Sequence, residues 1–221
     1  MLIGSPAPLG AGGAWRPLSA IAKHPVERAW AGPDGIVGDV QADSRVHGGP
    51  DKALHHYPRE HYAAWQAEIG AREVLDQAGA FGENLSTTGL GEADVCIGDR
   101  VRCGEALLEL AQSRQPCWKL SLRFDCPDLA ERVQDSGRTG WYWRVLEAGW
   151  IAPGDTFELI ARPYPDWPVA RLIEALYRRP LDRDLIAAAS ELAPLAGGHR
   201  KLFSRRLGEG QVEDWLPRLQ G

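Results

Sequence analysis

The sequence lacks any apolar stretch long enough to cross a bilayer, and its N-terminus lacks the charged head and apolar run of a secretory signal. The cytoplasm is therefore the expected location, and no membrane partner is expected. The formal net charge of −5 provides no broad basic surface, so nucleic acid is not an expected partner either. The sequence also contains no P-loop and no G-x-G-x-x-G motif, so neither of these nucleotide cradles is supported.

Cysteine is scarce and poorly spaced for a metal cluster. The four copies are Cys96, Cys103, Cys117 and Cys126. They include no C-x-x-C pair, and in a chain of this length they do not suggest a disulfide framework. They also lack the close spacing of a cysteine-ligated iron–sulfur cluster. Electrons for any redox reaction must therefore come from elsewhere.

Glycine and proline, by contrast, are abundant, with 25 and 16 copies. This composition favours a turn-rich, strand-rich body over a helical bundle. Two Gly-Asp turns between apolar residues, at Asp99 and Asp155, suit the tight corners of a barrel. Strands are expected in the short apolar segments at 18–21, 36–40, 53–56, 82–88, 106–111 and 141–146. The predicted body is mainly β, a barrel or strongly bent sheet, with a helix from about Pro58 to Gly70.

A proline-rich segment, 162–168, predicts a domain boundary that leaves a body over residues 1–162 and a helical unit over 163–221. After it, apolar residues recur at helical spacing. Asp182 is expected to cap a second helix that runs through Leu192, and Gly208 is expected to stop a third helix that begins at His199. The unit's nine Lys/Arg and eight Asp/Glu nearly balance, which argues against a DNA-binding helix pair. Packing or homodimerisation is its expected role.

Chemistry is expected in the stretch 112–124, which holds three cations, no acid and Cys117 directly after Pro116. Arg114, Lys119 and Arg123 favour the thiolate, which is the reactive and metal-binding form of cysteine. The proline stiffens the backbone that holds the thiol. The structural alternative is a buried cysteine that acts only as a small hydrophobic residue.

A second segment places two glycines, Gly48 and Gly49, between His47 and Lys52. Glycine permits positive φ and a close approach of the backbone to a ligand. With the flanking cation, the segment predicts an oxyanion or phosphate cradle. A tight turn between two strands explains the same residues without a ligand.

Four histidines fall near one another in the sequence, at His47, His55, His56 and His61. Their spacing does not match a metal helix such as H-E-x-x-H, so zinc is only a minor alternative. One of them could also serve as base to Cys117 in a metal-free Cys/His hydrolase. No sequence feature fixes the geometry that such a hydrolase requires.

Taken together, four ordered motifs closely resemble the MOSC-domain family, in its YiiM-like branch. They are Gly38-Asp39-x-Gln41-Ala-Asp43, His47-Gly-Gly-Pro-Asp-Lys52-Ala, Phe81-Gly-Glu-Asn84-Leu and Arg114-Gln-Pro-Cys117-Trp-Lys119-Leu. The resemblance covers nearly the whole chain. It implies a mainly β fold: a MOSC-type β-barrel with a few helices, followed by a small C-terminal three-helix segment.

The resemblance further implies a molybdenum cofactor, molybdopterin, with the Cys117 thiolate as ligand to the metal. His47 is then expected to line the open face of the metal as a catalytic residue. The phosphate of the pterin needs cations and backbone donors. The implied cofactor-binding residues are Lys52, Arg114, Gly48, Gly49, Asn84, Lys23, Arg138 and Lys119.

The activity that the resemblance implies is reduction of N-hydroxylated compounds, such as hydroxylaminopurine-type base analogues, to amines. Some relatives carry a C-terminal ferredoxin-like domain, whereas this sequence ends in a helical unit without clustered cysteines. A separate reductase is therefore the expected electron donor. The alternative is a non-catalytic module that carries the cofactor, or a persulfide on Cys117.

Overall fold

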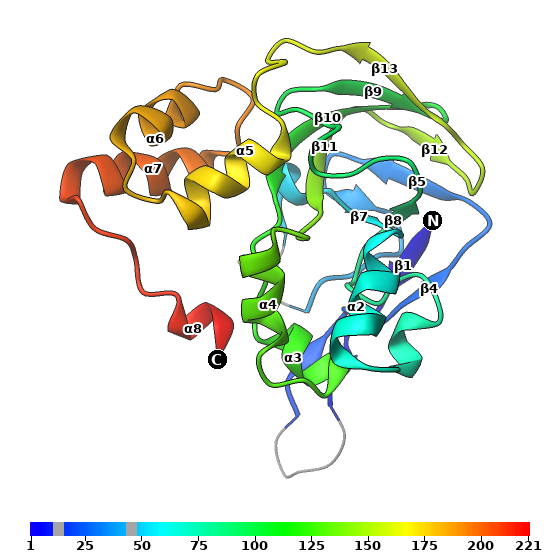
Figure 1. Cartoon of the computed structure of the whole chain (residues 1–221). Helices are drawn as coiled ribbons and strands as arrows, with labels where there is room; N and C mark the ends of the chain where they lie inside the picture. The colour runs from blue at the N-terminus through cyan, green and yellow to red at the C-terminus, as the bar shows by residue number, and fades with distance from the viewer. Residues whose placement is uncertain (11–15, 43–47) are drawn as a thin grey trace.

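A computed structural model of the protein describes residues 1–10, 16–42 and 48–221 (Figure 1). Its frame is a six-stranded sheet in the order β13-β9-β10-β11-β7-β8, which curls into a half-barrel. Neighbouring strands are antiparallel except for the parallel pair β7 and β8. The strands are β7 (Leu54–Pro58), β8 (Leu85–Thr87), β9 (Arg100–Cys103), β10 (Ala106–Ser113), β11 (Trp141–Glu147) and β13 (Phe157–Ala161). The predicted strongly bent sheet is confirmed.

Three smaller sheets are built mainly from the N-terminal part of the chain, where glycine and proline keep the strands short. One pairs β1 (Leu2–Gly4) with β4 (Lys23–Pro25), and a second pairs β2 (Ala7–Pro8) with β3 (Leu18–Ser19). In the third, β5 (Ala29–Gly32) lies between β12 (Gly149–Ile151) and β6 (Gly35–Ile36). The strand expected at 36–40 is therefore only the end of β6.

The two predicted Gly-Asp corners have a shared physical basis. The Asp99 carboxylate accepts a hydrogen bond from the Cys96 amide at 2.8 Å, and the Asp155 carboxylate accepts one from the Ala152 amide at 2.8 Å. The glycine before each aspartate has positive φ. The aspartate thus closes the turn while the glycine supplies its backbone conformation.

The expected first helix is present as α2 (His61–Ile69), and Gly70 follows it with a φ of 77°. Its predicted start was wrong, because Pro58 is the last residue of β7 and pairs with Thr87 of β8. Sheet pairing outweighs the local preference of proline for a first helical turn. The other helical elements before the C-terminal unit are short: η1 (Pro50–Lys52), η2 (Glu73–Leu75), α3 (Lys119–Phe124) and α4 (Leu129–Ser136).

The C-terminal unit consists of α5 (Val169–Ile173), the π-helical turn η3 (Glu174–Arg178), α6 (Arg183–Ser190), α7 (Gly197–Glu209) and α8 (Leu216–Leu219). The predicted cap of α6 is confirmed, because the Asp182 side chain accepts a hydrogen bond from the Leu185 amide at 3.0 Å. The predicted stop at Gly208 was wrong. Helix α7 continues to Glu209, and Gly210, with a φ of 66°, closes it.

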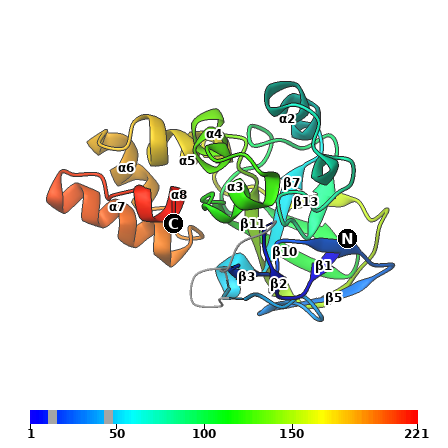
Figure 2. The ribbon, with the colours of Figure 1, turned by 90° about the horizontal axis from the view of Figure 1, so that it is seen from below.

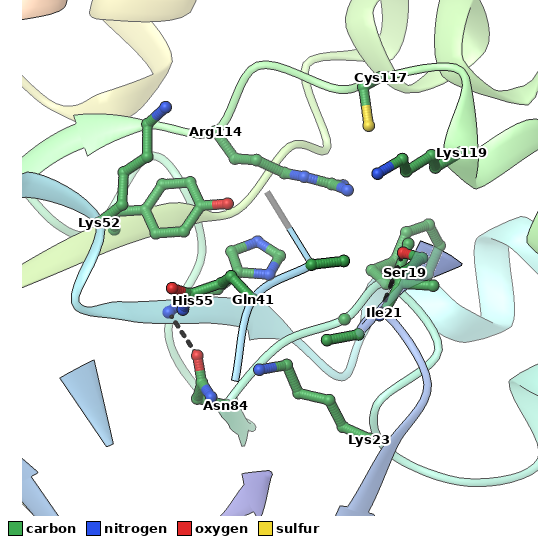
Figure 3. Close-up of a pocket in the computed structure, with 15 residues that line it drawn as sticks. Ser19, Ile21, Lys23, Gln41, Lys52, His55, Asn84, Arg114, Cys117 and Lys119 are labelled. Carbon is green, nitrogen blue, oxygen red and sulfur yellow. Dashed lines mark hydrogen bonds between the residues drawn. The ribbon is translucent and has the colours of Figure 1, made fainter. Parts of the chain in front are cut away.

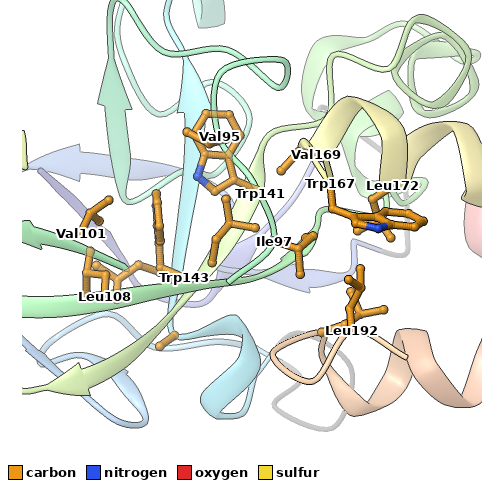
Figure 4. Packing of buried hydrophobic residues seen from close by; sticks show 14 of the residues in the cluster. Val95, Ile97, Val101, Leu108, Trp141, Trp143, Trp167, Val169, Leu172 and Leu192 are labelled. Carbon is orange, nitrogen blue, oxygen red and sulfur yellow. The ribbon is translucent and has the colours of Figure 1, made fainter. Parts of the chain in front are cut away.

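The apolar core runs without a break from the sheet into the helical unit (Figure 4). Leu108 and Trp143 of the sheet belong to the same buried cluster as Leu172 and Phe203 of the helices. Backbone bonds reinforce the junction: the Ile97 amide donates to the Trp167 carbonyl at 2.9 Å. The helical unit therefore packs on the sheet, while the predicted boundary at residue 162 stays a prediction. Within the described ranges, every helix is too short or too polar to span a bilayer.

Candidate functional site

A pocket opens between the N-terminal strands, β7, β11 and the loop that precedes α3 (Figure 3). It encloses about 630 Å³ of space between atoms, part of it open to solvent. Six of the residues predicted from the sequence line it: Lys23, Lys52, Asn84, Arg114, Cys117 and Lys119. The other lining residues are Ser19, Ala20, Ile21, Gln41, Ala42, His55, Phe81, Gly82 and Tyr142. The folded chain thus unites the ordered motifs of the sequence around one space.

Cys117 reaches this pocket from a loop between a buried strand and a short helix. Strand β10 ends at Ser113, and the next residue, Arg114, donates its amide to the Gly140 carbonyl at 3.0 Å. Helix α3 begins where the Leu120 amide donates to the Cys117 carbonyl at 3.0 Å. The Cys117 sulfur points into the pocket (Figure 3).

The remaining three cysteines are buried, whereas Cys117 is half-buried. Burial raises the pKa of Cys103 to about 12 and raises the pKa values of Cys96 and Cys126. These three thiols stay protonated at neutral pH and serve packing. The alternative interpretation, a buried cysteine that acts only as a small hydrophobic residue, fits Cys96, Cys103 and Cys126 but not Cys117.

Arg114 is the most distinctive cation of the pocket. Its residue surface is only 6% exposed, yet its Nη1 atom has no hydrogen-bond partner. A buried charged donor without an acceptor is costly, so this atom favours an anionic group in the pocket. Tyr142 lies beside it, and burial raises the pKa of the Tyr142 phenol, which therefore stays neutral.

Two of the predicted cofactor residues are already engaged with one carboxylate. The Lys23 Nζ atom lies 2.6 and 2.5 Å from the Asp39 oxygens, and the Asn84 amide nitrogen donates to Asp39 at 2.9 Å. Burial also lowers the pKa of Lys23. Asp39 therefore neutralises most of the charge that Lys23 brings, and the positive character of the pocket comes from Arg114, Lys52 and Lys119.

The two predicted glycines do not form the described wall of the pocket. Gly49 has the expected positive φ, 97°, and its carbonyl accepts from the Lys52 amide at 2.9 Å. It thereby starts the turn that brings Lys52 into the pocket. Gly48 precedes this turn, and His47 lies outside the described residues.

Two predicted cations are directed elsewhere. The Arg138 Nη2 atom donates to both carboxylate oxygens of Glu68 at 2.7 Å, and the guanidinium stacks 3.7 Å from the centre of the Trp65 ring. The structure places it at α2 and not among the lining residues of the pocket. Arg123 was expected around Cys117 but donates to the Ala80 carbonyl at 2.7 Å, because its position on α3 turns it toward that loop.

The histidines point in different directions. His55 lines the pocket with an unpartnered Nε2 atom, and burial, followed by the nearby Arg114, lowers its pKa well below the ordinary value. His56 bonds to Thr87 and Trp143 in the core, at 2.6 and 3.0 Å. Over residues 1–10, 16–42 and 48–221, no three His, Cys, Asp or Glu side chains form a metal-binding group, so the zinc alternative has no described ligand set.

Buried histidines predict a pH dependence of stability. Burial lowers the pKa values of His56 and His199 to about 3, whereas an unfolded histidine titrates near 6.5. Between these values the unfolded chain binds protons that the folded chain does not, so stability falls as the pH is lowered from about 6.5 toward 3. Each histidine contributes up to about 1.4 kcal/mol per pH unit. Urea denaturation over this range measures the slope.

His199→Gln is expected to reduce this slope by one histidine's share. His24 is exposed, so His24→Gln is the matched control and is expected to keep the wild-type slope. A wild-type slope in the His199 variant would contradict the assignment.

Tyr142 is a wall residue that the sequence analysis did not single out. Strand alternation sends Trp141 and Trp143 into the core and leaves Tyr142 on the pocket side, opposite His55. The only sign of this role in the sequence is that Tyr142 lies between two tryptophans in a predicted strand. It becomes informative only when the register of β11 on β7 is known.

Comparison with known proteins extends this description. Residues 43–158 match the model of the MOSC domain, and residues 167–210 match that of the YiiM-like 3-alpha helix domain. Protein YiiM of Escherichia coli K12 is 41% identical over 187 residues, which cover 85% of this chain and 83% of that protein. A protein named Reductase from Gibberella moniliformis is 42% identical over 72% of this chain, but the match spans only 28% of its own length.

Solved structures agree with the fold. The crystal structure of YiiM from Escherichia coli aligns with a TM-score of 0.81 at 33% identity, over 98% of this chain and 100% of that one. The structure of YiiM from Geobacillus stearothermophilus aligns with a TM-score of 0.78 at 31% identity, over 93% and 96%. The predicted barrel followed by a helical segment is confirmed.

Proposed function

Because the chain belongs to the MOSC-domain family, in its YiiM-like branch, we propose that it is a molybdenum-cofactor-dependent reductase of N-hydroxylated compounds. MOSC domains are associated with binding of the molybdenum cofactor. The fungal relative named Reductase supports an oxidoreductase role. N-hydroxylated bases, of the hydroxylaminopurine type, are the proposed substrate class.

The observation that carries the proposal is the unused donor of Arg114 in the same pocket as the Cys117 sulfur. The pterin cofactor combines a phosphate with a metal held by sulfur. Arg114 fits the anionic phosphate, and the Cys117 sulfur fits the metal. Arg114, with Lys52 and Lys119, would bind the anionic part. The Cys117 thiolate would complete the ligand set of a soft-ligand metal.

Other residues shape the pocket around this group. Asn84 holds the wall together, because its side-chain oxygen accepts from the His55 amide at 3.0 Å while its nitrogen donates to Asp39. Lys23 shares that carboxylate. We therefore assign Asn84 and Lys23 to the support of the pocket and the three remaining cations to the ligand.

When bound, the molybdenum supplies a two-electron redox centre for reduction of R–NH–OH to R–NH₂. Two electrons and two protons enter, the N–O bond breaks, and the oxygen leaves as water. The neutral Tyr142 phenol and the neutral His55 ring border the pocket and can hold a polar substrate there. A separate reductase is the proposed source of the electrons.

Metal analysis and a turnover assay test the proposal together. Protein purified from cells that make the cofactor, or reloaded with it, is expected to contain close to one molybdenum per chain. With a reduced viologen dye as electron donor, it is expected to convert 6-N-hydroxylaminopurine to adenine. Protein without the cofactor is the control.

Failure of metal uptake would contradict the proposed function. Full molybdenum without turnover on any N-hydroxylated compound would instead favour the carrier role. Mass spectrometry distinguishes a persulfide carrier, because the Cys117 peptide would then carry the mass of one extra sulfur.

A further inference from the structure

The C-terminal end of the chain folds back onto the loop that holds Cys117. In Figure 1, α8 lies apart from the other C-terminal helices and near α3 and α4; Figure 2 shows the same helices from below. The Arg218 Nη1 atom of α8 donates to the Pro116 carbonyl at 2.5 Å. The Trp118 amide donates in turn to the Arg218 carbonyl at 2.8 Å. Arg218 therefore holds the residue before Cys117 and the residue after it.

Further contacts fix the position of Arg218 itself. Its Nη2 atom donates to the side-chain oxygen of Gln134, a buried residue of α4. Its guanidinium lies 5.7 Å from the centre of the Tyr177 ring, in η3. The arginine thus joins three parts of the fold: the cysteine loop, α4 and the helical unit.

These contacts matter because the loop has little regular structure of its own. Residues 114–117 lie between the end of β10 and the start of α3. Pro116 is buried, and a buried carbonyl requires a donor. The guanidinium supplies a charge-assisted bond, which is stronger than one between neutral groups.

We propose that Arg218 is a positioning residue that keeps the Cys117 sulfur directed into the pocket. On this view the C-terminal segment is part of the site, although none of the described lining residues comes from it. The consequence for a bound metal depends on the proposed function. The restraint on the cysteine loop does not, so the two can be tested apart.

Thiol alkylation of the cofactor-free protein tests the restraint directly. Iodoacetamide labelling of each cysteine is followed over time by peptide mass spectrometry. Arg218→Ala is expected to raise the labelling rate of Cys117 by about tenfold, as loss of one charge-assisted bond allows the loop to open. Cys96, Cys103 and Cys126, which are buried, are expected to keep their rates.

Two further variants separate positioning from general stability. Arg218→Lys retains a cation that can reach one carbonyl, so it is expected to restore much of the wild-type rate. Arg183 donates to the Leu207 carbonyl within the helical unit at 3.0 Å, so Arg183→Ala is the matched control and is expected to leave Cys117 unchanged.

An unchanged Cys117 rate in Arg218→Ala would overturn the inference. So would an equal rise at all four cysteines, because that pattern reports general loosening of the fold. With reloaded protein, Arg218→Ala is further expected to lose molybdenum faster than wild type during gel filtration. If wild type takes up no molybdenum but the alkylation pattern holds, the proposed function fails and the positioning role stands.

Discussion

Replacement of Cys117 by serine is expected to abolish molybdenum retention and reductase turnover without unfolding the protein. Serine has nearly the same size as cysteine, and Cys117 is only half-buried in a loop, so the stability change is expected to stay within about 1 kcal/mol. The serine hydroxyl remains protonated at neutral pH and is a hard ligand, whereas thiolate is soft and readily formed. Molybdenum content and turnover of the reloaded variant measure the loss.

Cys126→Ser is the matched control for this experiment. Cys126 is buried near α3, and its thiol donates to the Asp128 carboxylate at 3.3 Å, a bond that serine can also make. This variant is expected to keep its metal and its turnover. If Cys117→Ser kept both as well, the cysteine would not be the metal ligand and the mechanism proposed for this pocket would be wrong.

Replacement of Arg114 by methionine is expected to weaken cofactor binding by about 100-fold, the size of one or two charge-assisted hydrogen bonds. The cofactor-free protein, however, is expected to be as stable as wild type or more stable by up to about 1 kcal/mol. Methionine has a similar length and removes a buried donor that has no acceptor in the protein. Urea denaturation measures the stability, and titration with the cofactor measures the affinity.

The opposite result is expected for Arg144, which provides the control. Arg144 pairs with Asp51 at 2.5 Å and with Glu109 at 2.6 Å. Arg144→Met removes the only arginine that pairs with Asp51 among the described ion pairs and leaves Glu109 with Arg100 alone, at 3.0 Å. It is expected to destabilise the cofactor-free protein by roughly 2–4 kcal/mol. Equal loss of stability in the two variants would show that Arg114 is a structural residue and not one reserved for a ligand.

This contrast between Arg114 and Arg144 bears on the function of the pocket. A buried cation with an unbonded donor lowers the stability of the folded, cofactor-free protein. Such sites are typical of ligand binding, where the missing partner arrives with the ligand. The same contrast could not be drawn from the sequence, because the acidic partners of Arg144, Asp51 and Glu109, lie far from it along the chain.

Several elements followed from local patterns alone. The apolar segments at 106–111 and 141–146 became β10 and β11, each within two residues of its predicted ends. Asp182 capped its helix as predicted, since a side-chain oxygen next to the first amides of a helix acts at short range. The predicted helix start at Pro58 was wrong because pairing of β7 with the distant strand β8 outweighed the local preference of proline. The predicted helix end at Gly208 was wrong because α7 runs to Glu209 and a second glycine, Gly210, closes it.

By itself, the sequence determined the type of fold and pointed to the loop that carries Cys117. Apolar spacing and turn residues act over a few positions, and the ordered motifs marked Cys117, Arg114 and Lys52 as members of one site. Only the tertiary structure decided which of the predicted cations line the pocket and which are paired with carboxylates. Lys23 forms an ion pair with Asp39, and Arg138 forms one with Glu68. Arg114 lines the pocket. Ion pairs join residues far apart in the chain, as does the contact of Arg218 with the cysteine loop, so no local pattern reveals them.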